Sequence, residues 1–155
     1  MAGGKGYIRF RGLRIDHVTT DFATAALHLG THNRVEDCKI EFNNGNGIVA
    51  QSGLVFKNSE ASHNGRLGIA LNGSNSYLDS SETSYNSWRY GPRWEAGGIK
   101  IIGNLPSGNR IVHHTAKYNN GIGIWFDTTD SGNIVEASRF EGNVFSALEF
   151  EAALG

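Results

Sequence analysis

Short segments in which every second residue is apolar recur along the whole chain. The clearest are 121–127 and 146–151, and the same alternation returns at 26–30, 47–51, 68–72 and 98–102. Alternation of this kind is typical of strands, whose successive side chains point to opposite faces. A second strand-like segment stands before each asparagine named below, at 35–40, 56–61, 78–83, 111–116 and 135–140, and no window shows a helical stripe. We therefore expect a chain built of short strands.

These strands repeat in a fixed relation to asparagine. Asn43, Asn64, Asn119 and Asn143 each stand four residues before a strand that begins with a small residue and an aliphatic one. The strand starts at 26, 47, 68, 98, 123 and 147 are spaced by 21, 21, 30, 25 and 24 residues. A repeat of this size cannot bury its apolar face alone, so stacked neighbours must supply the core. The pattern predicts one all-β solenoid domain of about six rungs over 1–155, or a fragment of a longer protein, with a loop insertion at 87–96.

The repeated asparagine followed by a glycine-isoleucine strand resembles the right-handed parallel β-helix repeats of pectate-lyase-like proteins, over essentially the whole chain. The resemblance implies a right-handed, single-stranded parallel β-helix with rungs about 4.8 Å apart. Five asparagines would then form an internal ladder, and Cys38 and a hydrogen-bonded His114 would face the interior. The expected ladder is Asn43, Asn64, Asn86, Asn119 and Asn143, and the expected inward columns are Ile48, Ile69, Ile99, Ile124, Leu148 and Ile40, Ala61, Thr83, Ala116, Phe140.

Composition narrows the classes of partner. The chain has 14 basic and 15 acidic residues, a balance that indicates neither a nucleic acid nor a membrane surface as partner. Its single cysteine excludes an internal disulfide. Residues 1–5 do not resemble a signal peptide, so we expect a cytosolic chain or a segment of an exported protein, with a secreted or periplasmic parent.

Candidate chemistry gathers on the outward columns of the later rungs. These columns read His28, Val49, Ala70, Lys100, Trp125, Glu149 and Gly30, Gln51, Asn72, Ile102, Asp127, Glu151. Asp127 and Glu151 would lie about 5 Å apart on consecutive rungs, the separation of the two carboxyl groups in retaining glycosidases. Like charges at that distance favour one protonated partner, and Trp125 would offer an apolar face to a sugar. The competing interpretation is a solvated acidic ladder neutralised by Lys100 or a bound cation.

A second resemblance concerns these rungs alone. The segments 123–127 and 148–151, with Asn133 between them, are similar to the catalytic rungs of retaining β-xylosidases built on a parallel β-helix. The similarity implies that Asp127 is the nucleophile and Glu151 the acid/base. From their places in the outward columns, we expect Lys100, Trp125 and Glu149 to bind the substrate. The chain departs from those enzymes in being far shorter and in lacking a sandwich-like second domain.

The insertion at 87–96 carries three aromatic residues and two arginines. Loops of this composition often wall a groove and stack on saccharide rings, although they also serve to cover the flank of a solenoid. Trp88, Tyr90 and Arg93 therefore join the predicted substrate-binding residues. Arg89 and Arg93 would meet the carboxylate of an acidic sugar or pair with Glu95.

Two further functions fit the same pattern. A polysaccharide lyase would need a base, such as Lys100 or His28, and arginine or Ca²⁺ to neutralise a uronate. Carboxylates for Ca²⁺ would come from Asp127, Asp130, Glu149 and Glu151, but the spacing of a calcium loop is missing and we predict no cofactor. The chain also shows no Cys/His metal set. A non-catalytic, structural segment is the other alternative, because ends without an amphipathic cap favour a homo-oligomer.

Overall fold

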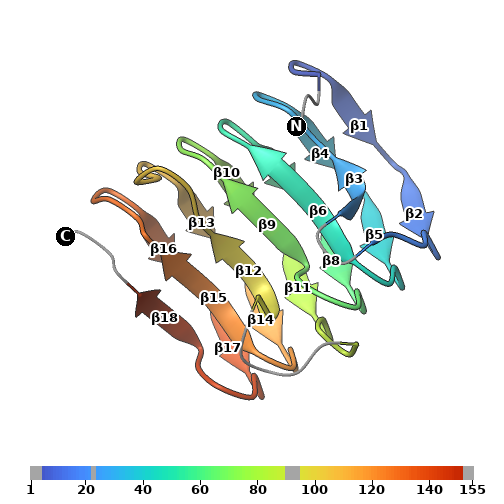
Figure 1. Ribbon diagram of the computed structural model, residues 1–155. Coiled ribbons are helices and arrows are strands. Elements are labelled where there is room, and N and C mark those ends of the chain that lie inside the picture. Colours follow the sequence, from blue (N-terminus) through green and yellow to red (C-terminus); the bar gives the residue numbers. More distant parts are fainter. Residues whose placement is uncertain (1–4, 22–23, 90–94, 152–155) are drawn as a thin grey trace.

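The computed structural model describes residues 5–21, 24–89 and 95–151. As predicted, these residues form an all-β parallel solenoid of about six turns, and they contain no helix (Figure 1). Each turn, called a rung below, gives one strand to each of three six-stranded parallel sheets. None of the described residues forms a helix that could cross a membrane.

The three sheets follow one another in every rung. Sheet A contains β1 (Arg9–Arg11), β4 (Arg34–Glu36), β7 (Val55–Lys57), β10 (Tyr77–Asp79), β13 (Arg110–Val112) and β16 (Ile134–Glu136). Sheet B contains β2 (Arg14–Asp16), β5 (Lys39–Glu41), β8 (Glu60–Ser62), β11 (Glu82–Ser84), β14 (Thr115–Lys117) and β17 (Arg139–Glu141). Sheet C contains β3 (Ala25–His28), β6 (Asn46–Gln51), β9 (Ile69–Asn72), β12 (Gly97–Ile101), β15 (Ile122–Asp127) and β18 (Leu148–Glu151).

The second strand expected in each rung is in fact two strands. Residues 35–40, for example, divide into β4 and β5 at Asp37, whose φ of 54° is left-handed. A non-glycine residue is rarely left-handed, and the strain is held here because Asp37 N donates to Lys57 O of the next rung at 3.1 Å. The same bend recurs in later rungs at Asn58, Ser80, His113 and Ala137. Sequence periodicity missed the bend because none of these residues is glycine.

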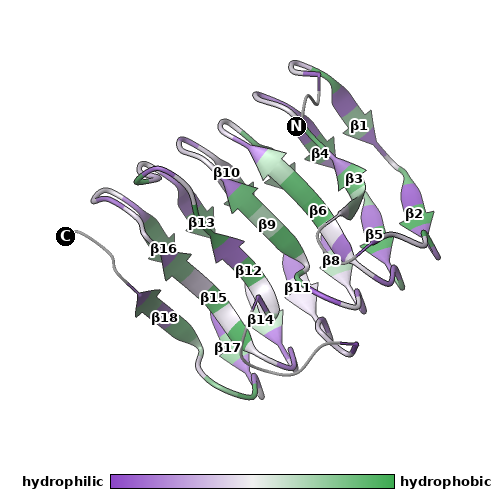
Figure 2. Ribbon diagram, in the orientation of Figure 1, coloured by the Kyte–Doolittle hydropathy of each residue, from purple (hydrophilic) through white to green (hydrophobic). Residues whose placement is uncertain are grey.

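The interior columns are confirmed. Ile48, Ile69, Ile99 and Ile124 pair in register along sheet C and are fully buried. Figure 2 colours much of β6 and β9 green, which marks hydrophobic residues. Cys38 is 2 % exposed. His114 is also interior, as expected, with Nδ1 2.8 Å from Ser81 Oγ and Nε2 2.9 Å from Thr83 Oγ1. Stacking thus buries an apolar core, and both ring nitrogens of the interior His114 have hydroxyl partners.

The asparagine ladder is confirmed as well. Each side-chain amide donates to the side-chain oxygen of the next ladder asparagine, at 2.9 Å from Asn43 to Asn64 and 3.0 Å from Asn86 to Asn119. The same amide group donates to a backbone carbonyl of the preceding rung, as Asn86 does to Ala61 O at 2.9 Å. The ladder therefore satisfies the buried backbone of the turn between sheets B and C.

The ladder also explains why glycine starts the sheet C strands. A Cβ at Gly68 would lie 2.8 Å from Asn86 Nδ2 and 2.8 Å from Gly98 O. A Cβ at Gly47 would likewise lie 2.7 Å from Asn64 Nδ2. The asparagine of one rung packs against the strand start of the rung before it, and only glycine leaves room. The asparagine side chain and the glycine backbone thus contact each other, which is why the two residues repeat together.

Candidate functional site

The predicted columns on the outer face of sheet C are present in the predicted register. Asp127 of β15 pairs with Glu151 of β18, so their Cα atoms are neighbours about 4.8 Å apart. One column over, Trp125 lies between Lys100 and Glu149. The carboxyl, ammonium and indole groups singled out from the sequence therefore share one patch of the last three rungs.

Lys100 is the centre of this patch. Its Nζ lies 3.0 Å from Asp127 Oδ2 and 3.7 Å from the centroid of the Trp125 ring. Although Lys100 belongs to an outward column, it is only 3 % exposed. Thr128 Oγ1 donates to the other Asp127 oxygen at 2.8 Å, and the Asp127 side chain keeps 17 % exposure. Asp127 is thus a carboxylate held from two sides and still open to solvent.

Trp125 is the largely buried aromatic residue of this patch. It is 7 % exposed, and its indole Nε1 is buried without a hydrogen-bond partner. Trp125 lines a hollow of about 340 Å³ together with Ile122, Phe145, Glu149 and Glu151. Lys100 covers one face of the indole. The indole N–H has no hydrogen-bond acceptor, which is rare for a buried donor.

Glu149 and Glu151 form the acidic side of the same hollow. Ser146 Oγ donates to Glu149 Oε2 at 3.1 Å, while Glu151 is exposed. Hydroxyl-rich ligands suit such a site, because the carboxylates accept hydrogen bonds from hydroxyl groups.

The remaining predicted residues lie elsewhere. Trp88 lines a different groove, at the turn between sheets B and C. Tyr90 and Arg93, with Trp94, lie outside the described residues. His28 shares its column with Lys100 but stands three rungs away, about 14 Å along the axis, so the two proposed lyase bases do not meet.

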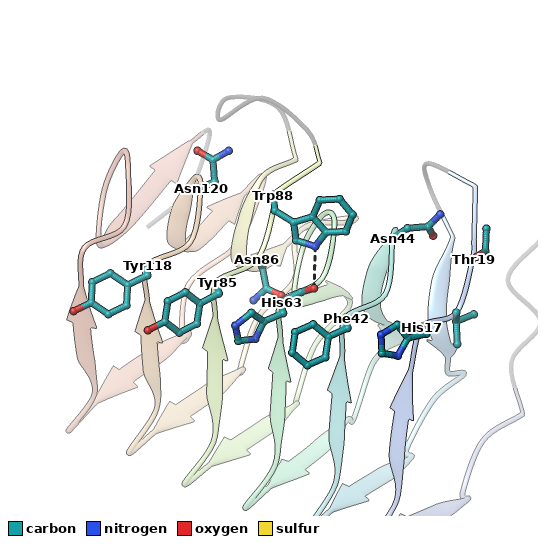
Figure 3. A pocket seen from close by; sticks show the side chains of 11 residues that line it. His17, Thr19, Phe42, Asn44, His63, Tyr85, Asn86, Trp88, Tyr118 and Asn120 are labelled. Carbon is teal, nitrogen blue, oxygen red and sulfur yellow. Dashed lines mark hydrogen bonds between the residues drawn. The ribbon is translucent and has the colours of Figure 1, made fainter.

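Sequence reasoning missed a column of stacked rings on the turn between sheets B and C. The rings stack with centroids 4.7 to 5.8 Å apart and are drawn together in Figure 3, where they follow one another as His17, Phe42, His63, Tyr85 and Tyr118. A signal was present, because an aromatic residue or histidine directly precedes four of the ladder asparagines. All five ring residues have left-handed backbone, which turns them outward from the bend.

The rings form the floor of a groove of about 650 Å³. Trp88 leans over this floor, with Nε1 donating to His63 O at 2.9 Å, and Asn44 and Asn120 line it as well (Figure 3). No Asp, Glu, Lys or Arg is among the described residues that line the groove. An apolar floor with amide groups beside it suits a neutral ligand with hydroxyl groups.

Carboxylates that could hold a cation gather away from sheet C. Among residues 5–21, 24–89 and 95–151, one group of three potential metal ligands comes together, namely Glu41, Glu60 and His63 on the outer face of sheet B. The four carboxylates proposed for Ca²⁺ do not form such a group.

Comparison with known families agrees with the architecture. A family model described as "Right handed beta helix region" matches residues 11–153. No match was found among curated proteins.

Proposed function

We propose that this chain, which belongs to the right-handed β-helix family, binds a saccharide on the sheet C face of its last rungs and hydrolyses it with retention of configuration. The observation that carries the proposal is the ion pair between buried Lys100 and solvent-accessible Asp127, with Glu151 beside Asp127 in register. A carboxylate nucleophile must be held in place, and the contact with Lys100 holds the Asp127 side chain. The resemblance of 123–127 and 148–151 to retaining β-helix β-xylosidases supports the same assignment.

The reaction divides between the two carboxyl groups. Asp127 attacks the anomeric carbon while protonated Glu151 gives its proton to the leaving oxygen, and a glycosyl ester forms on Asp127. Glu151 then takes a proton from water, which attacks the ester and releases the sugar. Trp125 borders the sugar ring and Glu149 accepts from one of its hydroxyl groups, so that both orient the ring. Lys100 acts through Asp127 and is a positioning residue.

Substitution of the two carboxylates tests this function. We expect Asp127→Asn and Glu151→Gln each to lower the release of aryl alcohol from an aryl glycoside by 100-fold or more, on the order of 10²–10⁴ for loss of an acid, base or nucleophile. Asp130→Asn and Glu136→Gln make the same chemical changes outside the column and should leave the rate unaltered. Turnover by the wild type that persists in both column variants would refute the assignment.

A second candidate is saccharide binding without turnover, in the aromatic groove. Two observations favour it: the groove has no Asp, Glu, Lys or Arg among its described lining residues, and a hydrogen bond to His63 O holds Trp88 over the rings. Retention of a neutral polysaccharide that is unchanged by Asp127→Asn and Glu151→Gln, with no product released, would support this candidate. A lyase is less well supported, because Lys100 is committed to Asp127 and Trp125.

A further inference from the structure

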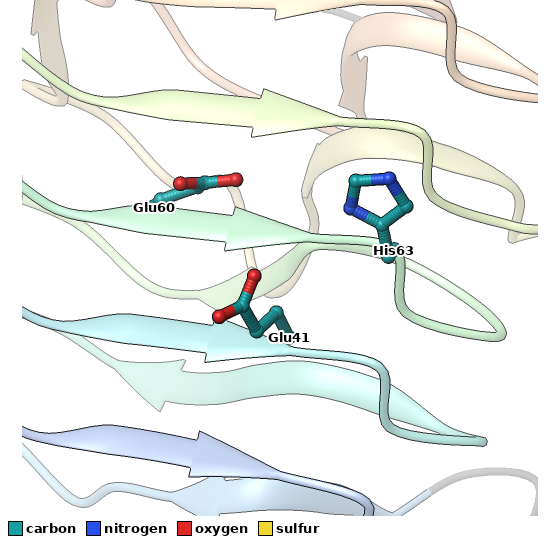
Figure 4. A group of neighbouring side chains, drawn as sticks. All are labelled: Glu41, Glu60 and His63. Carbon is teal, nitrogen blue, oxygen red and sulfur yellow. The ribbon is translucent and has the colours of Figure 1, made fainter.

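Two carboxylates and an imidazole converge on the outer face of sheet B. Glu41 belongs to β5, Glu60 to β8, and His63 to the turn that follows β8. One ligand atom from each lies within 4.8 Å of the others. Figure 4 shows the three side chains approaching a common space from two adjacent rungs. This cluster lies on a different sheet from the proposed saccharide site.

One ring nitrogen of His63 has no hydrogen-bond partner. His63 Nδ1 is buried and has no hydrogen-bond partner, and Figure 4 shows it on the side of the ring that faces the carboxylates. The ring is held from both faces, by Phe42 at 4.7 Å and Tyr85 at 4.8 Å between centroids. A buried nitrogen without a partner is rare and signals an absent ligand, water or ion.

A second unpartnered group lies in the following rung. Ser84 is fully buried and its Oγ has no partner. His63 N donates to Ser84 O at 2.9 Å, so the two residues are direct neighbours across the rungs. Ser62, beside them, donates its hydroxyl to Glu60. Two residues that are neighbours through their backbones therefore each have a buried side-chain atom without a partner.

The charge around the cluster leaves room for a cation. Arg14 Nε is shared, at 2.9 Å from both Asp16 Oδ2 and Glu41 Oε1. Lys39 Nζ is 3.4 Å from Glu60 Oε2, and its side chain is 60 % exposed. Three carboxylates thus face two cationic side chains, of which Lys39 is free to swing into solvent when a stronger cation binds. Glu41 is only 7 % exposed, so its side chain is held against the outer face of sheet B.

We propose that Glu41, Glu60 and His63 bind one divalent transition-metal ion. One imidazole nitrogen and two carboxylate oxygens are a donor set suited to Zn²⁺, whereas Ca²⁺ and Mg²⁺ prefer sites made of oxygen alone. A metal needs its ligand atoms somewhat closer than 4.8 Å, and the Glu60 side chain is long enough to close the gap. The ion would join the second and third rungs and give His63 Nδ1 its partner.

Calorimetric titration of untagged, metal-free protein with Zn²⁺ tests the site. We expect one ion per chain, with a rise in the thermal unfolding midpoint, because an ion that binds only the folded state stabilises it. His63→Phe keeps a ring in the stack and removes the nitrogen, so it should weaken Zn²⁺ binding at least tenfold, as should Glu60→Gln. His32→Phe makes the same exchange in another stacked ring, which packs on Tyr7 away from the cluster, and should bind like the wild type.

The result that overturns the site is equally direct. Zn²⁺ uptake that is the same in His63→Phe, Glu60→Gln and the wild type would place the ion elsewhere. Wild-type protein that takes up no Zn²⁺, or that binds Ca²⁺ and Mg²⁺ as tightly as Zn²⁺, would also contradict the proposal. None of these outcomes depends on glycoside hydrolysis.

Discussion

Asn86→Leu should destabilise the fold by about 3–9 kcal/mol, because three buried groups each lose a hydrogen-bond partner at about 1–3 kcal/mol each. Asn86 Nδ2 donates to Ala61 O at 2.9 Å, and Asn86 Oδ1 accepts from Asn64 N at 3.0 Å and from Asn64 Nδ2 at 3.1 Å. Leucine has a similar volume but makes none of these bonds. The loss is measured as the change in free energy of unfolding in urea.

A neighbouring amide outside the ladder serves as the control. Asn120 donates only to Ser87 O, at 3.1 Å, and is partly exposed. Asn120→Ala should therefore cost about 1 kcal/mol. Equal unfolding free energies for Asn86→Leu and Asn120→Ala would mean that the ladder does not hold the rungs together.

Stability should fall on acidification through His114. Burial lowers the pKa of His114 from 6.5 to about 3. Above pH 6.5 the side chain is neutral in both the folded and unfolded states and carries no penalty. Below that pH the unfolded chain takes up a proton that the folded chain refuses, so stability declines until about pH 3. At pH 4.5 the loss is about 2–3 kcal/mol relative to pH 7.

The slope of stability against pH separates this effect from others. His114→Gln removes the titrating group, so its unfolding free energy should change less between pH 7 and pH 4.5 than that of the wild type, whatever its absolute stability. A nuclear magnetic resonance signal of the His114 ring that stays constant over the same range gives an independent check. A wild-type slope that His114→Gln reproduces would show that His114 is not its source.

The repeat itself could be predicted because its contacts repeat. Four of the five ladder asparagines pack against a glycine one rung away, so the two residues recur at one spacing that is visible in the sequence. The bend between sheets A and B was not visible, because Asp37 and Ala137 reach left-handed backbone with no common residue type. Rung-to-rung hydrogen bonds hold that conformation, and they become apparent only once the rungs are stacked.

The candidate site was predictable in register but not in environment. Equal spacing placed Asp127 beside Glu151 and Lys100 beside Trp125, and the sheet pairing confirms both. The burial of Lys100 was not predictable, because it depends on the side chains that surround an outward position. The cluster of Glu41, Glu60 and His63 was equally hidden, since its members come from two rungs and share no motif.

The site and the fold are linked through Lys100. An ammonium that is 3 % exposed on the outside of a sheet is stable because Asp127 and Trp125 both contact it. The same contacts hold the Asp127 carboxylate next to Glu151, which lies in register on the neighbouring rung. Stacking thus creates a pair of carboxyl groups from residues twenty-four positions apart in the chain.

Trapping of the glycosyl ester tests the proposed function most directly. A panel of activated 2-deoxy-2-fluoro glycosides, β-xylosides among them, would be incubated with the protein, and peptides would be sequenced by mass spectrometry. We predict an adduct of one fluorosugar on Asp127. It accumulates because the fluorine slows both the formation and the hydrolysis of the glycosyl ester, whereas the good leaving group keeps the formation fast. An adduct on Glu151, or the absence of any adduct while the same sugar's aryl glycoside is turned over, would contradict the assignment of Asp127 as nucleophile.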